Sequence, residues 1–333
     1  MTINEYIKKY QQPIFTTFTN AINSNTLSHA YLLSGVPGTP LKEIALTLAK
    51  TLFCYNPSPL SCNNCLSCHR FDENYIHDFI FLDGSKGNIL INDIRDLSFE
   101  FSKTAIEKSG LLVYVIHLAE KLTPEAANAL LKFLEEPSID ICAFLTTENE
   151  DYVLPTIISR SQKLLVKQIP REITLQKCDE LEIPRVHSEL IVNFYNYPDT
   201  ILEVYRNEEY LLLFALFNET LKKLSSSIDE TIYYLQTEGM DIILKSKNNR
   251  RFMGFYIRLF VILWGDLLNY KIGAPLTLNA YKESITKIAP KFKNIDYLLT
   301  VFLESYNQIN RYVNLQLLRD HLLNTMYKER ING

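Results

Sequence analysis

The sequence has little that would suit a membrane, a secretion pathway or general binding to nucleic acid. No apolar run approaches the roughly 18 residues that a membrane-spanning helix needs, and the polar N-terminus, residues 1–9, lacks the apolar core of a signal peptide. The 34 Lys and Arg residues are outnumbered by 38 Asp and Glu residues, which gives a net charge of −4. The chain as a whole is therefore not expected to bind nucleic acid through its overall charge. The sequence predicts a cytoplasmic protein with no contact to a membrane.

Positive charge is concentrated at one place in the second half of the chain. This cluster consists of Lys245, Lys247, Arg250 and Arg251. Two interpretations stay open: the cluster contacts DNA, or it is a solvated loop.

The length and composition are those of an ordinary globular protein with more than one domain. The chain has 333 residues, of which 47% are hydrophobic and 22% charged. A chain of this length is too long for one small core, so two or three domains are expected. No internal repeat or low-complexity segment is evident.

The first half of the chain shows the alternation that is typical of a parallel α/β sheet covered on both faces. Helical patterns separate five apolar runs, at residues 30–33, 79–82, 111–116, 142–145 and 163–166. The clearest helix is predicted over residues 124–136. Thr123 is its expected N-cap, Pro124 suits its first position, and Pro137 is expected to end it. Ala127, Leu130, Leu131 and Leu134 lie on one face of this helix, which is therefore expected to be buried.

From about residue 168 the strand signal disappears and helical patterns continue to the end. A small helical unit is expected to about residue 207, followed by long amphipathic helices. Trp264 and many Tyr and Phe residues lie in this last part, where core packing is their expected role.

The segment from Ala30 to Lys50 looks like a Walker A phosphate loop without its central residues. An apolar strand, a glycine turn and a helix follow one another, and Gly35 takes the first position of the pattern G-x-x-x-x-G-K-[S/T]. Pro40 stands in place of the second glycine, Leu41 in place of the lysine, and Lys42 in place of the hydroxyl residue. No cofactor is expected to bind at the degenerate loop, which contains Gly35, Gly38, Thr39, Pro40, Leu41 and Lys42.

A second nucleotide-handling element is also missing. In a working ATPase of this architecture, the third strand ends in an acidic pair that serves magnesium and the attacking water. Here His117 and Leu118 take those positions, and Glu120 comes three residues late, in the following turn. His117 is expected to be a satisfied polar residue rather than a base. Two defective elements together indicate that hydrolysis has been abandoned.

Four of the six cysteines lie within fifteen residues of one another, at Cys54, Cys62, Cys65 and Cys68. Two tight C-x2-C turns suit the tetrahedral sulfur coordination of Zn²⁺, and a reducing cytoplasm favours metal over disulfides. His69 could replace one ligand, but four Cys already close the shell, so the predicted zinc is structural.

The two other cysteines are not part of this group. Cys142 lies in a predicted buried strand and is expected in the core. Cys178 indicates nothing about function.

Three segments together resemble bacterial clamp-loader subunits of the AAA+ class, and most closely the delta-prime type. These are the Cys array at residues 54–68, "LTPEAANALLKFLEEPS" at 122–138 and "LPTIISRSQ" at 154–162. The resemblance runs from about residue 10 to 167 and returns at "RYVNLQLLRDHLL", residues 311–323, which is similar to the last helix of clamp-loader collar domains.

The resemblance implies a three-domain architecture. An AAA+ module with a zinc-knuckle insertion would occupy residues 1–167, a small helical lid domain 168–207, and an all-α collar domain for oligomerisation 208–333.

The resemblance also implies a role for Arg160 as a trans-acting catalytic residue. In the family, a Ser-Arg-Cys motif presents an arginine to ATP held by the neighbouring subunit; here the motif is Ser159–Arg160–Ser161, so its last position departs from the pattern. A guanidinium offers a fork of donors matched to phosphate oxygens and stabilises charge on the transferring phosphoryl group.

The predicted function is therefore that of a non-hydrolysing subunit of the clamp loader of the DNA polymerase III holoenzyme, a nucleotidyltransferase complex used in DNA replication. The implied partners are gamma/tau-type motor subunits and a delta subunit directly, and the sliding clamp and primed DNA through the assembled complex. No ATPase activity is expected of the isolated chain. Two alternatives remain: an active gamma/tau-type motor ATPase, in which Lys42 and Glu120 would replace the missing groups, or a zinc-bearing interaction module outside replication.

Overall fold

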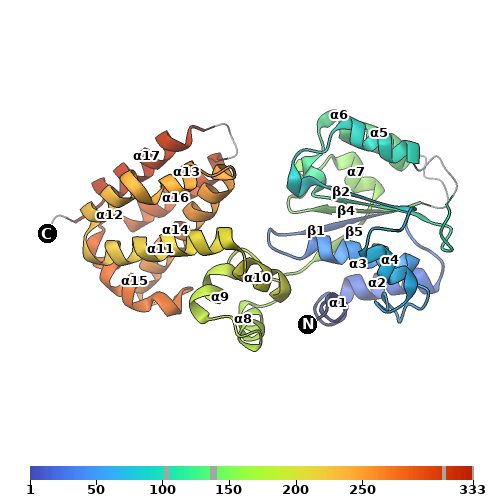
Figure 1. Ribbon diagram of the computed structural model, residues 1–333, viewed down its shortest axis with the longest axis horizontal. Helices are drawn as coiled ribbons and strands as arrows, with labels where there is room; N and C mark the ends of the chain where they lie inside the picture. The colour runs from blue at the N-terminus through green and yellow to red at the C-terminus, as the bar shows by residue number, and fades with distance from the viewer. Residues whose placement is uncertain (101–104, 136–140, 310–312, 332–333) are drawn as a thin grey trace. The chain divides into compact units, whose positions relative to one another are not determined.

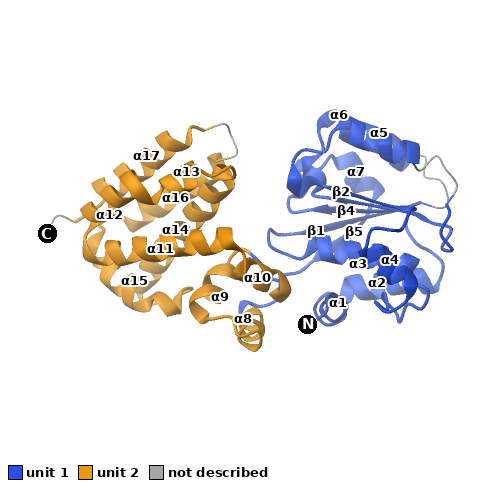
Figure 2. Cartoon of the chain, in the orientation of Figure 1, with its two compact units in different colours: residues 1–171, 195–197 blue, residues 172–194, 198–333 orange. Residues whose placement is uncertain are grey.

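The computed structural model of the protein describes residues 1–100, 105–135, 141–309 and 313–331. The described chain forms two compact units (Figure 2). Unit 1 contains residues 1–171 and 195–197, and unit 2 contains residues 172–194 and 198–333. The further division of the helical part at residue 207 stays a prediction.

Unit 1 is built on a five-stranded parallel sheet in the order β2-β3-β4-β1-β5, which confirms the predicted α/β class. Each predicted apolar run forms one strand. The strands are β1 (Ala30–Gly35), β2 (Phe79–Asp83), β3 (Leu112–His117), β4 (Ile141–Thr147) and β5 (Gln162–Val166).

Helices cover both faces of this sheet, which explains why the central strands are apolar throughout. Figure 1 shows α5 and α6 on one face and α2 and α3 on the other. The helices of this unit are α1 (Ile3–Tyr10), α2 (Gln12–Asn23), α3 (Leu41–Phe53), α4 (Leu66–Asp72), α5 (Ile91–Glu100), α6 (Pro124–Glu135) and α7 (Pro155–Arg160).

Alternate residues of the three central strands, β3, β4 and β1, supply the cores on the two faces of the sheet. Leu32 and Tyr114 pack on the α6 side, with Leu130 and Leu134 of that helix. On the opposite side, the Tyr31 ring stacks on Phe144, with centroids 5.4 Å apart.

Helix α6 begins as predicted. The N–H of Ala126 donates to Thr123 Oγ1 at 3.3 Å, which is the expected N-cap interaction. The expected end of this helix, Glu136 and Pro137, lies outside the described residues.

Unit 2 contains no strand among its described residues, as the sequence predicts from about residue 168. Its helices are α8 (Arg171–Glu180), α9 (Arg185–Ile191), α10 (Pro198–Tyr205), α11 (Glu208–Ser226), α12 (Ile228–Tyr234), α13 (Asp241–Leu244), α14 (Asn249–Ile272), α15 (Lys282–Ile288), α16 (Ile295–Gln308) and α17 (Leu315–Lys328), with a short π-helix, η4 (Leu235–Gly239), after α12. The collar-like segment at residues 311–323 falls mostly in α17, although 311 and 312 are outside the described residues.

Among the described residues, α14 is the one helix that is long and apolar enough to cross a membrane by length and composition. Arg258 and Asp266 interrupt its apolar residues, so the sequence still contains no uninterrupted apolar run of the length of a membrane span. Within the fold, 61% of the apolar window is buried, and Trp264 is fully buried between Phe292 and Phe302. Helix α14 therefore packs as the core helix of unit 2, and the predicted core role of Trp264 is confirmed.

Candidate functional site

The loop after β1 is closed on itself. In a phosphate loop the backbone N–H groups point at the ligand. Here the N–H of Thr39 donates to the carbonyl of Val36 at 3.2 Å, and the N–H of Leu41 donates to that of Thr39 at 2.8 Å. The Thr39 hydroxyl also donates to Val36, at 2.8 Å. Pro40 has no N–H to offer, so much of the loop's donor capacity is used internally or missing.

The side chain of Leu41 fills the space beside the first glycine. Leu41 is only 1% exposed, and a Cβ added to Gly35 would lie 3.2 Å from its Cδ2 atom and 2.6 Å from Thr39 Oγ1. Gly38, with φ +88°, makes the turn, and its carbonyl accepts the N–H of Asn196 at 2.8 Å. An apolar side chain thus lies at the position of the phosphate-gripping lysine.

Lys42 has a specific partner that the sequence did not reveal. Its Nζ atom lies 3.1 Å from Oδ2 of Asp83, the last residue of β2, and 5.0 Å from the centre of the Phe81 ring. The Asp83 side chain is only 7% exposed. Burial alone would raise the pKa of Asp83, but hydrogen bonds from Ser85 and the Lys42 ammonium lower it. Lys42 therefore neutralises a buried carboxylate.

His117 ends β3 as a satisfied polar residue, as predicted. Its Nδ1 atom lies 2.8 Å from Thr146 Oγ1, and the N–H of Leu118 donates to the same oxygen at 3.0 Å. Burial lowers the pKa of His117 to about 4, although nearby Asp83 opposes this shift. The ring is therefore neutral at pH 7. Leu118, with φ +59°, turns the chain sharply at the second acidic position.

Glu120 is held by the loop after β4. Its Oε1 atom accepts the N–H of Glu148 at 2.9 Å, and its Oε2 atom is buried without a hydrogen-bond partner among the described residues. The carboxylate lies in the short 3₁₀ turn Ala119–Lys121, as expected.

The four cysteines of the predicted metal site come together. Their sulfur atoms all lie within 4.8 Å of one another. The distance is 4.0 Å between the sulfurs of Cys54 and Cys65, and 4.0 Å between those of Cys62 and Cys68. A tetrahedron with Zn–S bonds of about 2.3 Å has edges of about 3.8 Å, so the arrangement fits such an ion with small adjustments.

Local structure holds this cysteine cluster in place. Cys54 follows α3 directly, and Cys65 is the N-cap of α4. The Ser67 hydroxyl donates to the carbonyl of Phe53 at 2.7 Å, which ties the two helices together. Burial raises the pKa of the Cys65 thiol, but hydrogen bonds, first those involving the backbone of Tyr55 and Cys68, lower it to about 6. A thiolate is the form that binds metal.

The remaining cysteines and His69 lie outside the cluster. His69 is exposed and does not belong to the group of four ligand residues found in the described part of the chain. Cys142 and Cys178 are buried, which confirms the expected core position of Cys142.

Arg160 is the last residue of α7 and is held by two contacts. Its Nη2 atom donates to Glu135 Oε1 at 2.6 Å, and its Nη1 atom donates to the carbonyl of Thr156 at 3.1 Å. The side chain is 35% exposed. A guanidinium has five N–H donors, so three remain after these two bonds.

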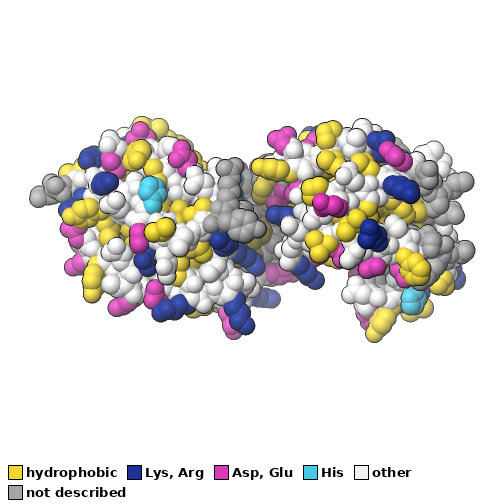
Figure 3. Space-filling view, turned by 90° about the horizontal axis from the view of Figure 1, so that it is seen from above, with side chains coloured by type: hydrophobic (Ala, Val, Ile, Leu, Met, Phe, Trp, Pro, Cys, Tyr) yellow, Lys and Arg dark blue, Asp and Glu magenta, His cyan; other side chains and the backbone are white. Residues whose placement is uncertain are grey.

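The basic cluster of unit 2 is partly used within the fold. Arg250 donates to the carbonyls of Ile309 and Val313, at 2.8 and 3.1 Å, and Lys245 pairs with Asp241 at 2.8 Å. These contacts do not decide between the two interpretations of the cluster, contact with DNA and a solvated loop. Basic and acidic side chains both occur across the visible face of each unit (Figure 3), in keeping with the small net charge.

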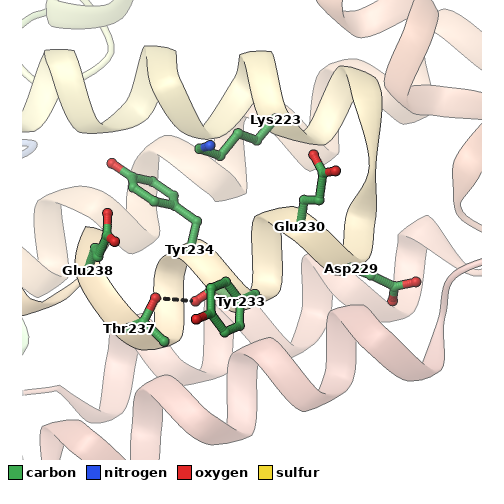
Figure 4. Close-up of a pocket in the computed structure, with 7 residues that line it drawn as sticks. All are labelled: Lys223, Asp229, Glu230, Tyr233, Tyr234, Thr237 and Glu238. Atoms are coloured by element: carbon green, nitrogen blue, oxygen red, sulfur yellow. Dashed lines mark hydrogen bonds between the residues drawn. The ribbon is translucent and has the colours of Figure 1, made fainter.

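A cavity of about 420 Å³ in unit 2 contains none of the predicted site residues (Figure 4). It lies among α11, α12 and η4, and Lys223 Nζ lies 4.9 Å from the centre of the Tyr234 ring. The residues that line it are Lys223, Asp229, Glu230, Tyr233, Tyr234, Thr237 and Glu238. Three carboxylates against one ammonium do not suit a phosphate ligand.

Three side-chain contacts of the candidate site could not be found from the sequence. Asp83 pairs with Lys42, Thr146 contacts His117, and Glu135 pairs with Arg160. Asp83 and Thr146 lie at the carboxyl ends of parallel strands, where ligands bind in open α/β sheets. This position at the strand ends was the one feature of the sequence that could have indicated Asp83 and Thr146 as site residues.

Known proteins provide a separate comparison. The family described as "DNA polymerase III, delta subunit" matches residues 10–170. The DNA polymerase III subunit delta' of Bacillus subtilis is 29% identical over 321 residues, covering 95% of this chain and 96% of that protein. The DNA polymerase III subunit tau of the same organism is 35% identical over 175 residues, which are 51% of this chain but only 30% of the relative.

A solved structure supports the fold. A DNA polymerase III gamma subunit-related protein from Thermotoga maritima superposes with a TM-score of 0.54, at 18% identity, over 94% of this chain and 98% of that one. This likeness concerns the fold alone.

Sequence and fold together define the class that the chain resembles: it is similar to the clamp-loader family of DNA polymerase III subunits. Within that family, its similarity over nearly the full length is to a delta-prime subunit. The resemblance expected from the sequence is confirmed.

Proposed function

We propose that the chain is the delta-prime subunit of a bacterial replicative clamp loader, that it hydrolyses no ATP itself, and that it supplies Arg160 in trans to ATP on an adjacent subunit. One observation carries the proposal. The position of the phosphate-gripping lysine holds the buried Leu41, while Arg160 keeps an exposed side chain with free donor capacity.

Electrostatics support the loss of hydrolysis. At pH 7 the end of β3 carries a neutral imidazole in place of two carboxylates, because burial lowers the pKa of His117 to about 4. Lys42, the cation that the motor alternative would use, is already paired with Asp83. The rival motor function would need Lys42 to leave this carboxylate unpaired inside the protein, which is costly. It would also need Glu120 to leave the Glu148 backbone.

The cysteine cluster would hold a structural Zn²⁺, since four sulfurs close the coordination shell and leave no open position for catalysis. In the proposed layout, unit 1 is the AAA+ module, and unit 2 contains the lid and collar domains. The collar would assemble with gamma/tau-type and delta subunits in the cytoplasm. The sliding clamp and primed DNA would be reached through the assembled complex.

Reconstitution tests this function. The purified chain is mixed with gamma/tau-type motor and delta subunits, and the ATPase rate is measured with and without sliding clamp and primed DNA. We expect a stable complex whose stimulated ATPase requires this chain. A complex that forms and is stimulated equally well without it would contradict the proposal, and ATP turnover by the chain alone would favour the motor alternative.

A further inference from the structure

The ion pair between Arg160 and Glu135 joins two elements that are firmly anchored in unit 1. Glu135 follows the buried Leu134 at the end of the described part of α6, and Arg160 ends α7, in which Ile157 is buried. Leu134 and Ile157 belong to the same hydrophobic core. The two charged side chains therefore project from backbones whose positions are fixed.

The pair itself is exposed and adds little to folding. The side chains of Arg160 and Glu135 are 35% and 49% exposed, and ion pairs of this kind contribute little to stability because solvent screens them. Its effect lies in geometry. A free arginine samples many rotamers, whereas Arg160 is held at two nitrogen atoms, by the Glu135 carboxylate and the Thr156 carbonyl.

We propose that Glu135 is a positioning residue that holds the Arg160 guanidinium ready to receive the phosphate of an ATP on the neighbouring subunit. The inference rests on the proposed function of Arg160. Glu135 touches no substrate and acts only through the arginine.

The number of N–H donors that Arg160 keeps free indicates that Glu135 supports the guanidinium and does not withhold it from phosphate. The two contacts use one N–H on each terminal nitrogen of Arg160, and the guanidinium has five N–H donors in a rigid fork. Three donors remain for phosphate oxygens while both contacts persist. A finger that is already ordered loses less rotamer freedom when it engages the phosphate, so its transition-state contact forms at lower cost.

The test uses the full-length chain assembled with motor and delta subunits, and measures kcat and KM for ATP. Glu135→Ala should lower kcat at the site facing this chain about three- to tenfold, a fraction of the roughly 30-fold that complete loss of arginine rotamer freedom represents. KM should stay unchanged, because Glu135 does not contact ATP. Glu135→Gln should recover most of the rate, since its amide oxygen still accepts from Nη2.

A matched control and a double variant separate the possible failures. Glu125→Ala alters another exposed glutamate of α6 and should leave the rate unchanged. In an Arg160→Ala background, Glu135→Ala should cause no further loss.

Two results would overturn the ideas separately. If Arg160→Ala leaves the rate unchanged, the proposed function of Arg160 is wrong. If Arg160→Ala slows the reaction but Glu135→Ala leaves the rate unchanged, then Glu135 does not position the arginine. If Glu135→Ala accelerates the reaction, then Glu135 withholds the arginine from the phosphate.

Discussion

Protonation of His117 should make unit 1 less stable in mild acid. Burial lowers the pKa of His117 in the folded state to about 4, from an ordinary value of 6.5. The unfolded chain therefore binds a proton between these two values while the folded chain does not. The stability that comes from the neutral ring is fully present above about pH 6.5 and is lost as the pH falls toward about 4.

The size of this effect follows from the pKa difference. A difference of about 2.5 pKa units corresponds to about 3 to 4 kcal/mol at most, reduced by solvent screening because the ring is only partly buried. Charged neighbours act in both directions: Asp83 favours the protonated ring and Lys42 opposes it. His117→Gln removes the titrating group and keeps an oxygen and an amide that can pair with the Thr146 hydroxyl.

Urea unfolding of the wild type and of His117→Gln, measured from pH 7.5 to pH 4.5, is the assay. Circular dichroism follows the whole chain, and fluorescence of Trp264, the single tryptophan, identifies the transition of unit 2. The free energy of unfolding of unit 1 should fall more steeply toward acid in the wild type. Parallel pH profiles for the two proteins would refute the reasoning.

Three further predictions concern the metal, the ion pair and the degenerate loop. Protein purified without chelators should contain one Zn²⁺ per chain and Cys65→Ser should lose it while the sheet stays folded; metal-free wild-type protein would contradict this. Lys42→Met should lower the free energy of unfolding of unit 1 by about 1 kcal/mol, because Asp83 loses its cation, and an unchanged urea midpoint would argue against that role. Calorimetry with Mg-ATP should show no binding to the isolated chain, because Leu41 brings no charge and Pro40 no N–H; a dissociation constant in the micromolar range would count against the account.

The sheet and its main helix could be predicted because their signals are local. Strands buried on both faces must be continuously apolar. The start of α6 is marked in the sequence by the N-cap residue Thr123 and by Pro124 at the first helical position. The missing residues of the Walker elements were equally visible, since each motif requires a particular residue type at each of its positions.

Contacts between separate elements could not be predicted. Lys42 meets Asp83 only because α3 starts beside the end of β2, 41 residues away, and no spacing rule connects them. The contacts of Asp266 in α14 were hidden for the same reason. Its carboxylate accepts the N–H groups of Thr277 and Leu278 inside the fold.

The most direct test of the central claim is the rate of sliding-clamp loading onto primed DNA by a reconstituted loader that contains wild-type chain, Arg160→Ala or Arg160→Lys. Both variants should assemble as the wild type does, because Arg160 is a surface residue whose ion pair adds little to folding. A finger arginine changes the rate at a single site by roughly 10³ to 10⁵, and only one site would face this chain. We therefore expect total ATPase to fall modestly, clamp loading to fall more, and Arg160→Lys to rescue poorly, since an ammonium lacks the planar fork. Clamp loading by the Arg160→Ala complex at the wild-type rate would contradict the account.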